Sequence, residues 1–158
     1  MAKPVSEGKT QVKQNEAKWS PELMRAGWTA VPSVILEYQH KLGLDALDVN
    51  ILLQLATFWW HKENLPRPAK ATIAKRMDVD PSTVRRRIAK LEKAGLIKRI
   101  ARRTDTGQRP NEYDFTGLIE QAKPYALQKQ RDREERKRQD ATRQRKGFKV
   151  ISGGKAEA

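Results

Sequence analysis

Two short helices joined by a tight turn are the pattern that most constrains the fold of this chain. Residues 69–77 carry apolar side chains at helical spacing and are followed by a turn rich in aspartate. Asp80 is a suitable N-cap, Pro81 suits the first position of a helix, and Gly95 is a typical helix end. The sequence therefore predicts a short helix, a turn and a second helix over 81–94.

The second of these helices has one apolar and one basic face. Val84, Ile88 and Leu91 share one side, and the opposite side carries Ser82, Arg86, Ala89, Lys90 and Lys93. Residues 81–103 contain nine Lys/Arg and one acidic residue, a local charge of +8 on a chain whose net charge is +14. Such a surface is suited to a polyanion. Because the apolar face is needed for the core, we expect nucleic acid rather than a membrane surface.

The flanking segments complete a fold that is mostly α with a small β-hairpin (α+β). Asp45 can cap a helix over 46–62 that is apolar on most of its surface, which is typical of the centre of a core. Residues 96–103 alternate like a strand, 104–110 contain turn residues, and 111–115 return as a second strand.

Several functional classes are excluded by composition. The chain has no cysteine, so disulfides and thiolate metal sites are impossible, and its two histidines lie far apart without acidic neighbours at ligand spacing. No catalytic constellation is present, so we predict no enzyme activity, no metal and no cofactor. No apolar run reaches the length of a membrane span, and no small-molecule ligand is evident. We expect a cytoplasmic protein.

Residues 68–100, PAKATIAKRMDVDPSTVRRRIAKLEKAGLIKRI, resemble the winged helix-turn-helix domains of bacterial and phage regulators and plasmid replication proteins. The matching positions are Thr72, Ile73, Ala74, Thr83, Val84, Arg86, Leu91, Gly95, Leu96 and Ile97. The similarity covers about residues 27–116. It implies that helix 81–94 reads the DNA major groove and that hairpin 97–115 is a wing with flanking N- and C-terminal helices around the domain.

The resemblance also assigns roles to particular residues. It implies that Ser82, Thr83, Arg85 and Arg86 contact bases and phosphates, and that Arg102, Arg103, Gln108 and Arg109 of the wing contact the backbone or an adjacent minor groove. To these predicted DNA-binding residues we add Lys70, Thr72, Arg87 and Lys90. Arg87 lies on a flank of the helix, where a phosphate contact and a plain surface charge are equally compatible with the pattern.

We divide the chain into a disordered N-terminal tail (1–18), a helical extension (19–43), the winged helix-turn-helix DNA-binding domain (44–116), a charged C-terminal segment (117–146) and a disordered tail (147–158). The charged segment is compatible with an exposed helix held by ion pairs or with a disordered arm. The helices over 21–42 and 118–145 are candidates for a homodimer contact, because aromatic side chains gather there: Trp19, Trp28 and Tyr38.

Three functions fit these observations. The leading hypothesis is a sequence-specific transcriptional regulator of double-stranded DNA, a repressor that occludes a promoter as a homodimer on paired half-sites. The alternative is a plasmid or phage replication protein that binds origin repeats. A third is an architectural or RNA-binding protein whose basic tail dominates binding. We expect a bacterial or phage-encoded, nucleoid-associated protein.

Overall fold

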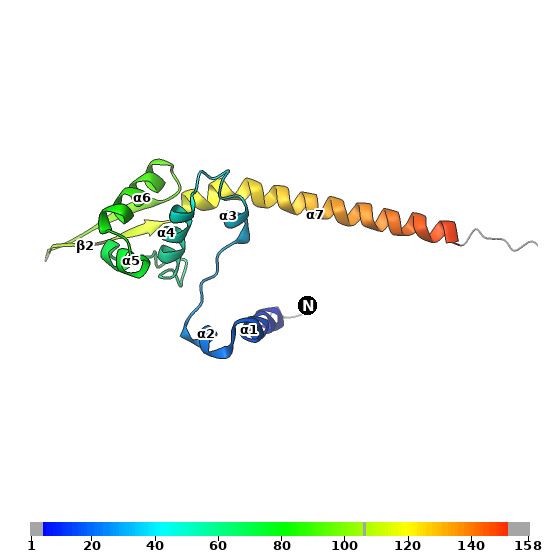
Figure 1. Ribbon diagram of the computed structural model, residues 1–158, viewed down its shortest axis with the longest axis horizontal. Coiled ribbons are helices and arrows are strands. Elements are labelled where there is room, and N and C mark those ends of the chain that lie inside the picture. Colours follow the sequence, from blue (N-terminus) through cyan, green and yellow to red (C-terminus); the bar gives the residue numbers. More distant parts are fainter. Residues whose placement is uncertain (1–4, 106, 152–158) are drawn as a thin grey trace, which may run out of the picture.

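The computed structural model describes residues 5–105 and 107–151 of the 158-residue chain. The elements of this part are α1 (Val5–Trp19), α2 (Pro21–Ala26), α3 (Ser33–Glu37), α4 (Ala46–Ala56), α5 (Lys70–Met77), α6 (Pro81–Lys93), β1 (Lys98–Thr104), β2 (Gly107–Asp114) and α7 (Thr116–Ile151). The two strands pair as an antiparallel hairpin, which confirms the predicted fold class. Figure 1 shows α4, α5, α6 and the hairpin gathered in one body, with α1 and α2 set apart from it and α7 projecting away.

Helix α4 lies at the centre of the core. Ile51 and Leu55 on α4 are completely buried, and Val84 and Ile88 on α6 are buried in the same cluster. Leu91 completes the apolar stripe of α6, so the predicted inward face of this helix is confirmed. Burial of each such side chain contributes about 1.5–3 kcal/mol. This stripe fixes which face of α6 remains at the surface.

The turn between α5 and α6 follows from local chemistry. Asp78 ends α5 with φ 51° and ψ 48°, a left-handed conformation that aspartate tolerates better than most residues. The Asp80 carboxylate accepts a hydrogen bond from the Ser82 N–H at 2.7 Å, and Pro81 occupies the first helical turn. The predicted turn and helix start are therefore confirmed.

Two helices are shorter than the sequence predicted. Helix α4 ends at Ala56 instead of continuing to residue 62, and the Thr57 hydroxyl donates to the Gln54 carbonyl at 2.7 Å where it ends. Beyond this point the Trp59 ring stacks on Phe115, with centroids 5.3 Å apart. Helix α3 likewise stops at Glu37 instead of residue 42. At the C-terminal ends of α4 and α3, contacts with segments distant in sequence outweigh helical periodicity.

The hairpin is also displaced from its predicted bounds. Strand β1 begins at Lys98, because Leu96 and Ile97 are buried in the core before the ladder starts. Strand β2 begins at Gly107, so the connection is shorter than the predicted turn over 104–110. The strand pairing therefore continues closer to the tip of the wing than the sequence indicated.

Helix α7 runs without interruption through Pro124, although a proline inside a helix usually interrupts it. The missing N–H of a proline leaves one carbonyl of the preceding turn unpaired, and this turn is exposed to water. Beyond it, Tyr125 stacks on Tyr38, the residue that follows α3, with ring centroids 4.9 Å apart. The Lys129 ammonium donates to both carboxylate oxygens of Glu37 at 2.6 Å. These contacts hold the first part of α7 on the body.

The start of α7 packs closely against the chain that leaves α6. The Leu118 N–H donates to the Leu96 carbonyl at 2.7 Å, and a Cβ added at Gly117 would lie 1.9 Å from the Gly95 carbonyl oxygen. Only glycine fits this approach without backbone movement.

Replacement of Gly117 with alanine is expected to lower the free energy of unfolding by about 1–3 kcal/mol, because the new methyl group overpacks this contact. Urea denaturation would measure the change. The direction of the change distinguishes the two cases. At an unobstructed helical position, replacement of glycine with alanine raises the free energy of unfolding by up to about 1 kcal/mol. A more stable variant would therefore contradict the close packing.

The N-terminus differs from the prediction. Helix α1 occupies residues 5–19, where we predicted a disordered tail over 1–18, because its Glu, Lys, Gln and Ala residues favour helix even without an apolar face. Residues 1–4 of that tail lie outside the described residues. Of the predicted C-terminal tail, 147–151 belong to α7 and the remainder, 152–158, also lies outside the described residues.

Candidate nucleic-acid interface

The outer face of α6 presents two arginines to solvent. Arg85 and Arg86 are exposed, and Arg86 forms no hydrogen bond or ion pair with any residue that the structure describes. Ser82 is exposed and Thr83 half-buried in the first turn of the same helix. The N-terminal turns of α6 therefore carry free guanidinium groups, hydroxyls and the positive end of a helix dipole on one accessible surface.

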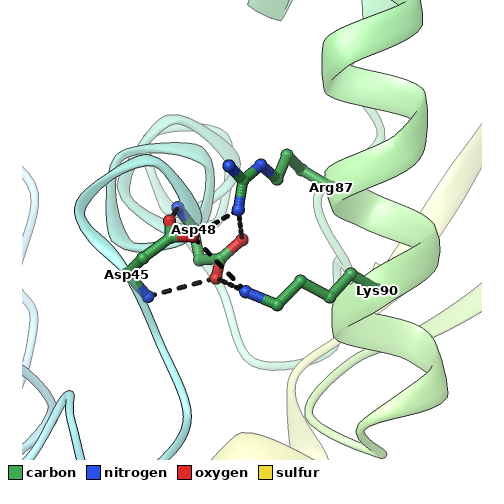
Figure 2. A network of polar contacts seen from close by, with 4 residues as sticks. All are labelled: Asp45, Asp48, Arg87 and Lys90. Carbon is green, nitrogen blue, oxygen red and sulfur yellow. Dashed lines mark hydrogen bonds and ion pairs between the residues drawn. The ribbon is translucent and has the colours of Figure 1, made fainter.

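Arg87, the next residue, and Lys90, one turn further along, are instead held by the start of α4 (Figure 2). The Arg87 guanidinium donates to Asp45 and lies 3.4 Å from an Asp48 oxygen. The Lys90 ammonium lies 2.5 Å from Asp48 and 3.4 Å from Asp45. Asp48 is completely buried, so its charge is compensated within the protein. Two carboxylates thus already bind Arg87 and Lys90, two of the residues predicted to contact DNA, whereas Arg86 has no such partner among the described residues.

The two aspartates also cap α4. Each carboxylate accepts the backbone N–H of the other residue, at 2.9 Å for Asp48 N–H and 3.1 Å for Asp45 N–H. The sequence predicted the cap at Asp45 but not the ion pairs to α6, whose members lie about forty positions away in sequence. The sequence showed a second aspartate in the first turn of the predicted core helix, but no local pattern links it to α6.

This network contributes to the acid dependence of the fold. The Asp48 N–H first, and then Arg87, hold the pKa of Asp45 at about 2, below its ordinary value of 3.8. The hydrogen bond to the Asp45 carboxylate raises the pKa of Arg87, and the hydrogen bond to the Asp48 carboxylate raises the pKa of Lys90. A carboxyl group with a lowered pKa in the folded state stabilises the fold above its unfolded pKa, and this contribution is lost as the pH falls through the folded pKa.

Stability is therefore expected to fall between pH 4 and pH 2 partly through Asp45. Other carboxylates titrate in the same window, so the relevant quantity is the difference between proteins. Asp45→Asn should unfold more easily than the parent at pH 6, and the two proteins should converge towards pH 2, as measured by chemical denaturation at each pH. A constant difference across this range would contradict the assignment.

The start of α5 adjoins this surface. Lys70 is half-buried, and burial first, then the positive charges of Arg99 and Arg85, lower the pKa of its ammonium group. Thr72, in the first turn of the same helix, is exposed. A cleft of about 180 Å³ has both Lys70 and Arg109 in its lining, so it joins α5 to strand β2. The fold thus brings together two of the predicted DNA-binding residues, Lys70 from α5 and Arg109 from β2.

On the wing, the predicted residues are not equivalent. Arg102 is half-buried and lies 3.4 Å from the Glu112 carboxylate. Arg103 and Arg109 are exposed and form no ion pair within the described part of the chain. Gln108 pairs with Arg103 in the strand ladder, but its side chain lies outside the described residues. Arg103 and Arg109 are therefore the accessible cations of the wing.

Ion pairs divide the basic residues of 81–103 into two groups. Acidic side chains hold Arg87, Lys90, Arg99 and Arg102, whereas no ion pair within the described residues holds Arg85, Arg86, Lys93, Lys98 and Arg103. The local charge of +8 counted from the sequence therefore overstates what this surface offers to a polyanion. Its free cations concentrate at the start of α6 and on the wing.

Other kinds of site find no support in residues 5–105 and 107–151. No group of three or more His, Asp or Glu residues there is arranged to hold a metal ion. None of the helices in this part combines the length and the apolar character needed to cross a membrane.

Known proteins are similar to this chain in family and in fold. The model of the DnaD N-terminal domain family matches residues 31–134. The crystal structure of the N-terminal domain of DnaD protein from Geobacillus kaustophilus HTA426 is 22% identical, with a TM-score of 0.52 over 77% of this chain and 96% of that one. A possible transcriptional regulator from Methanosarcina mazei Go1 is 21% identical, with a TM-score of 0.40 over 68% and 85% of the two chains. A crystal structure of MarR is 20% identical, with a TM-score of 0.40 over 95% and 93%.

Among curated protein sequences, none is detectably similar to this chain. The helix-turn-helix, the hairpin that follows it and the similarity in fold confirm the predicted winged-helix architecture. The family match spans well over half of the chain and includes α3 to α6, the whole hairpin and the part of α7 that packs on the body. This protein therefore belongs to the DnaD N-terminal domain family.

Proposed function

We propose that this protein binds double-stranded DNA in a sequence-specific manner, with α6 in the major groove and the β1–β2 hairpin as a wing. The observation that carries the proposal is the division of α6 into a buried apolar face and an outer face with a free Arg86. A major-groove helix must dock on its core through one side and present donors on the other. An arginine can donate two hydrogen bonds to the O6 and N7 atoms of guanine.

The surroundings of α6 support the same placement. Ser82, Thr83 and the exposed N-terminal turn are suited to a DNA phosphate, because backbone N–H groups and the helix dipole favour an anion there. Arg103 and Arg109 of the wing are suited to the phosphates beside the groove. Arg87 and Lys90 are left out of the proposed DNA-binding residues because Asp45 and Asp48 bind them.

We further propose that this binding represses transcription by occupying a promoter. Membership of the DnaD N-terminal domain family supports a second candidate, a replication protein that binds repeated sites at an origin. Footprinting on the DNA that encodes the protein and its surroundings would separate the two roles. Protection across a promoter supports the repressor, and protection of several direct repeats supports the replication protein.

A homodimer is part of the proposal, and the structure changes which residues support it. Tyr38 stacks on Tyr125 of the same chain, so it is no longer a candidate for a contact between copies. Trp19 and Trp28 remain about half exposed, beside an exposed Leu23 on α2. Large apolar side chains exposed together mark an interaction surface. Light scattering at concentrations where DNA is bound tests this, and a monomer would reject it.

Selection of bound sequences from a random DNA pool tests the proposal as a whole. A symmetric dimer predicts a palindrome whose half-sites lie about 10 base pairs apart, one turn of the duplex. Recovery of no preferred sequence would contradict sequence-specific binding.

Removal of residues 131–158 is expected to leave the preferred DNA sequence unchanged while flattening the salt dependence of affinity. This segment carries ten basic and five acidic residues, and the cut preserves the contacts of Tyr125 and Lys129 with α3. For every phosphate that the shortened protein no longer neutralises, the slope of log K against log salt should become shallower by about 0.9. Affinity measured from low to high salt checks this. Complete loss of binding would instead favour the architectural or RNA-binding hypothesis.

A further inference from the structure

The start of α5 and strand β2 form the two walls of the cleft of about 180 Å³ that adjoins the proposed DNA-binding surface. Lys70 lies in one wall and Arg109 in the other, and no acidic side chain contributes to the lining. Neither cation forms an ion pair or a hydrogen bond through its side chain with a residue that the structure describes. Two unpaired positive charges from separate elements therefore share one cleft.

The backbone fixes the two walls relative to each other. The Tyr113 N–H of β2 donates to the Pro66 carbonyl at 2.9 Å, so the strand is joined to the segment that leads into α5. Between two pairs of the β1–β2 ladder, one residue of β1 lies opposite two of β2, Pro110 and Asn111, which is a β-bulge. Both residues of this bulge line the cleft. A bulge interrupts the pairing and redirects side chains, and it also tolerates a proline.

Positive charge converges on Lys70 from other elements as well. Burial first, and then the charges of Arg99 and Arg85, lower the pKa of the Lys70 ammonium group. Glu92 is the acidic residue that acts on Lys70, but its carboxylate binds Arg99 at 2.5 Å. The charge of Lys70 is thus incompletely compensated, and an anion in the cleft would stabilise it.

The first turn of α5 adds hydrogen-bond donors to the same cleft. Ala69 is the N-cap of α5, lines the cleft and has no side-chain oxygen to accept the backbone N–H groups of that turn. Ser, Thr, Asp or Asn is the usual residue at such a position, because its side chain satisfies these donors. With alanine there, the N–H groups and the positive end of the helix dipole remain available to an anion that the two cations attract.

We propose that the cleft binds one phosphate group of the DNA backbone, which Lys70 and Arg109 contact together. The assignment rests on the proposed binding of double-stranded DNA and adds to it a contact shared by the helix-turn-helix and the wing. A volume of about 180 Å³ is several times the roughly 30 Å³ of a water molecule, so a phosphate group fits. A phosphate held from both walls fixes the wing relative to α5 while α6 lies in the groove.

Salt dependence tests whether the two cations share a phosphate. Affinity of the full chain for a random-sequence duplex is measured from low to high salt for the parent, for Lys70→Gln, for Arg109→Gln and for the double variant. If both cations neutralise one phosphate, the double variant should flatten the slope of log K against log salt by about 0.9 in total. Two separate phosphates would give about 1.8, and an unchanged slope would mean that neither cation contacts DNA. Either of these results would overturn the proposal.

A carboxylate placed in the cleft provides the second test. Ala69→Asp caps the first turn of α5 and repels a phosphate, so it should raise the urea concentration at the midpoint of unfolding while weakening duplex binding about fivefold or more. Ala69→Ser supplies a neutral cap and should weaken binding much less. Gln39→Glu adds one negative charge at an exposed position outside the cleft and should leave affinity within about twofold. Unchanged duplex affinity in Ala69→Asp would overturn the proposal.

These results are separable from a failure of the proposed function, because a random-sequence duplex is bound without base reading. A loss of about 0.9 in slope without any preferred sequence would refute sequence-specific binding and support the cleft. An unchanged slope with a preferred sequence would refute the cleft alone. Stoichiometric binding of inorganic phosphate alone, measured by calorimetry, would assign the cleft to the free anion and overturn the DNA contact. A parent protein that binds no duplex would overturn both.

Discussion

Replacement of Arg86 with alanine is expected to weaken binding to the preferred DNA site by about 5- to 150-fold, the equivalent of about 1–3 kcal/mol. Arg86 lies in the second turn of α6, is exposed, and forms no ion pair or hydrogen bond with a described residue. Its guanidinium is therefore available to a guanine edge without first breaking an interaction inside the protein. Affinity for random DNA should fall much less, because one charge among many is removed.

Two matched variants sharpen this experiment. Arg86→Lys keeps the charge but loses the planar pair of donors, so it should lose most of the base discrimination and little of the affinity for random DNA. Lys93→Ala removes one charge from the last turn of the same helix, away from the turns proposed to enter the groove, and should weaken all sequences alike. If Arg86→Ala behaves like Lys93→Ala, Arg86 does not read bases.

Replacement of Asp48 with alanine is expected to lower the free energy of unfolding by about 3 kcal/mol. The substitution removes one half of the cap on α4 and the buried partner of Lys90. Asp45 remains to bind Arg87 but does not replace the buried carboxylate. Urea denaturation at neutral pH measures the loss.

The exposed Asp140 on α7 provides the control, because Asp140→Ala removes the same charge and should change stability by less than about 0.5 kcal/mol. A second measurement, affinity for random DNA, distinguishes the loss of these ion pairs from an ordinary loss of packing. Asp48→Ala releases Lys90 from its closest partner, so affinity for random DNA should rise and its salt dependence should steepen. A folded variant with unchanged stability would show that the ion pairs contribute nothing to the joint between α4 and α6.

The helix-turn-helix could be predicted because its signals are local. Asp80, Pro81 and the spacing of Val84, Ile88 and Leu91 act within one helix, and the structure preserves them. The position of the free Arg86 follows from the same stripe. By contrast, the partners of Arg87 lie about forty positions away, so no local pattern distinguishes Arg87 from Arg86.

The helix and strand boundaries that were predicted wrongly share a different cause. Helix α4 ends early where Trp59 meets Phe115, and β1 begins late because Leu96 and Ile97 enter the core. In each case packing against a distant segment overrides the period of the sequence. Pro124 does not end α7, because its exposed turn allows water to satisfy the carbonyl that a proline leaves unpaired.

The length of α7 has a geometric consequence. Beyond Lys129, the described side chains of α7 hydrogen-bond only within the helix itself, and the helix continues to Ile151. At a rise of about 1.5 Å per residue, this stretch is about 33 Å long. That length is close to one turn of B-form duplex, about 34 Å. A contact at the far end of α7 would therefore be separated from the body by about the length of one turn of the duplex.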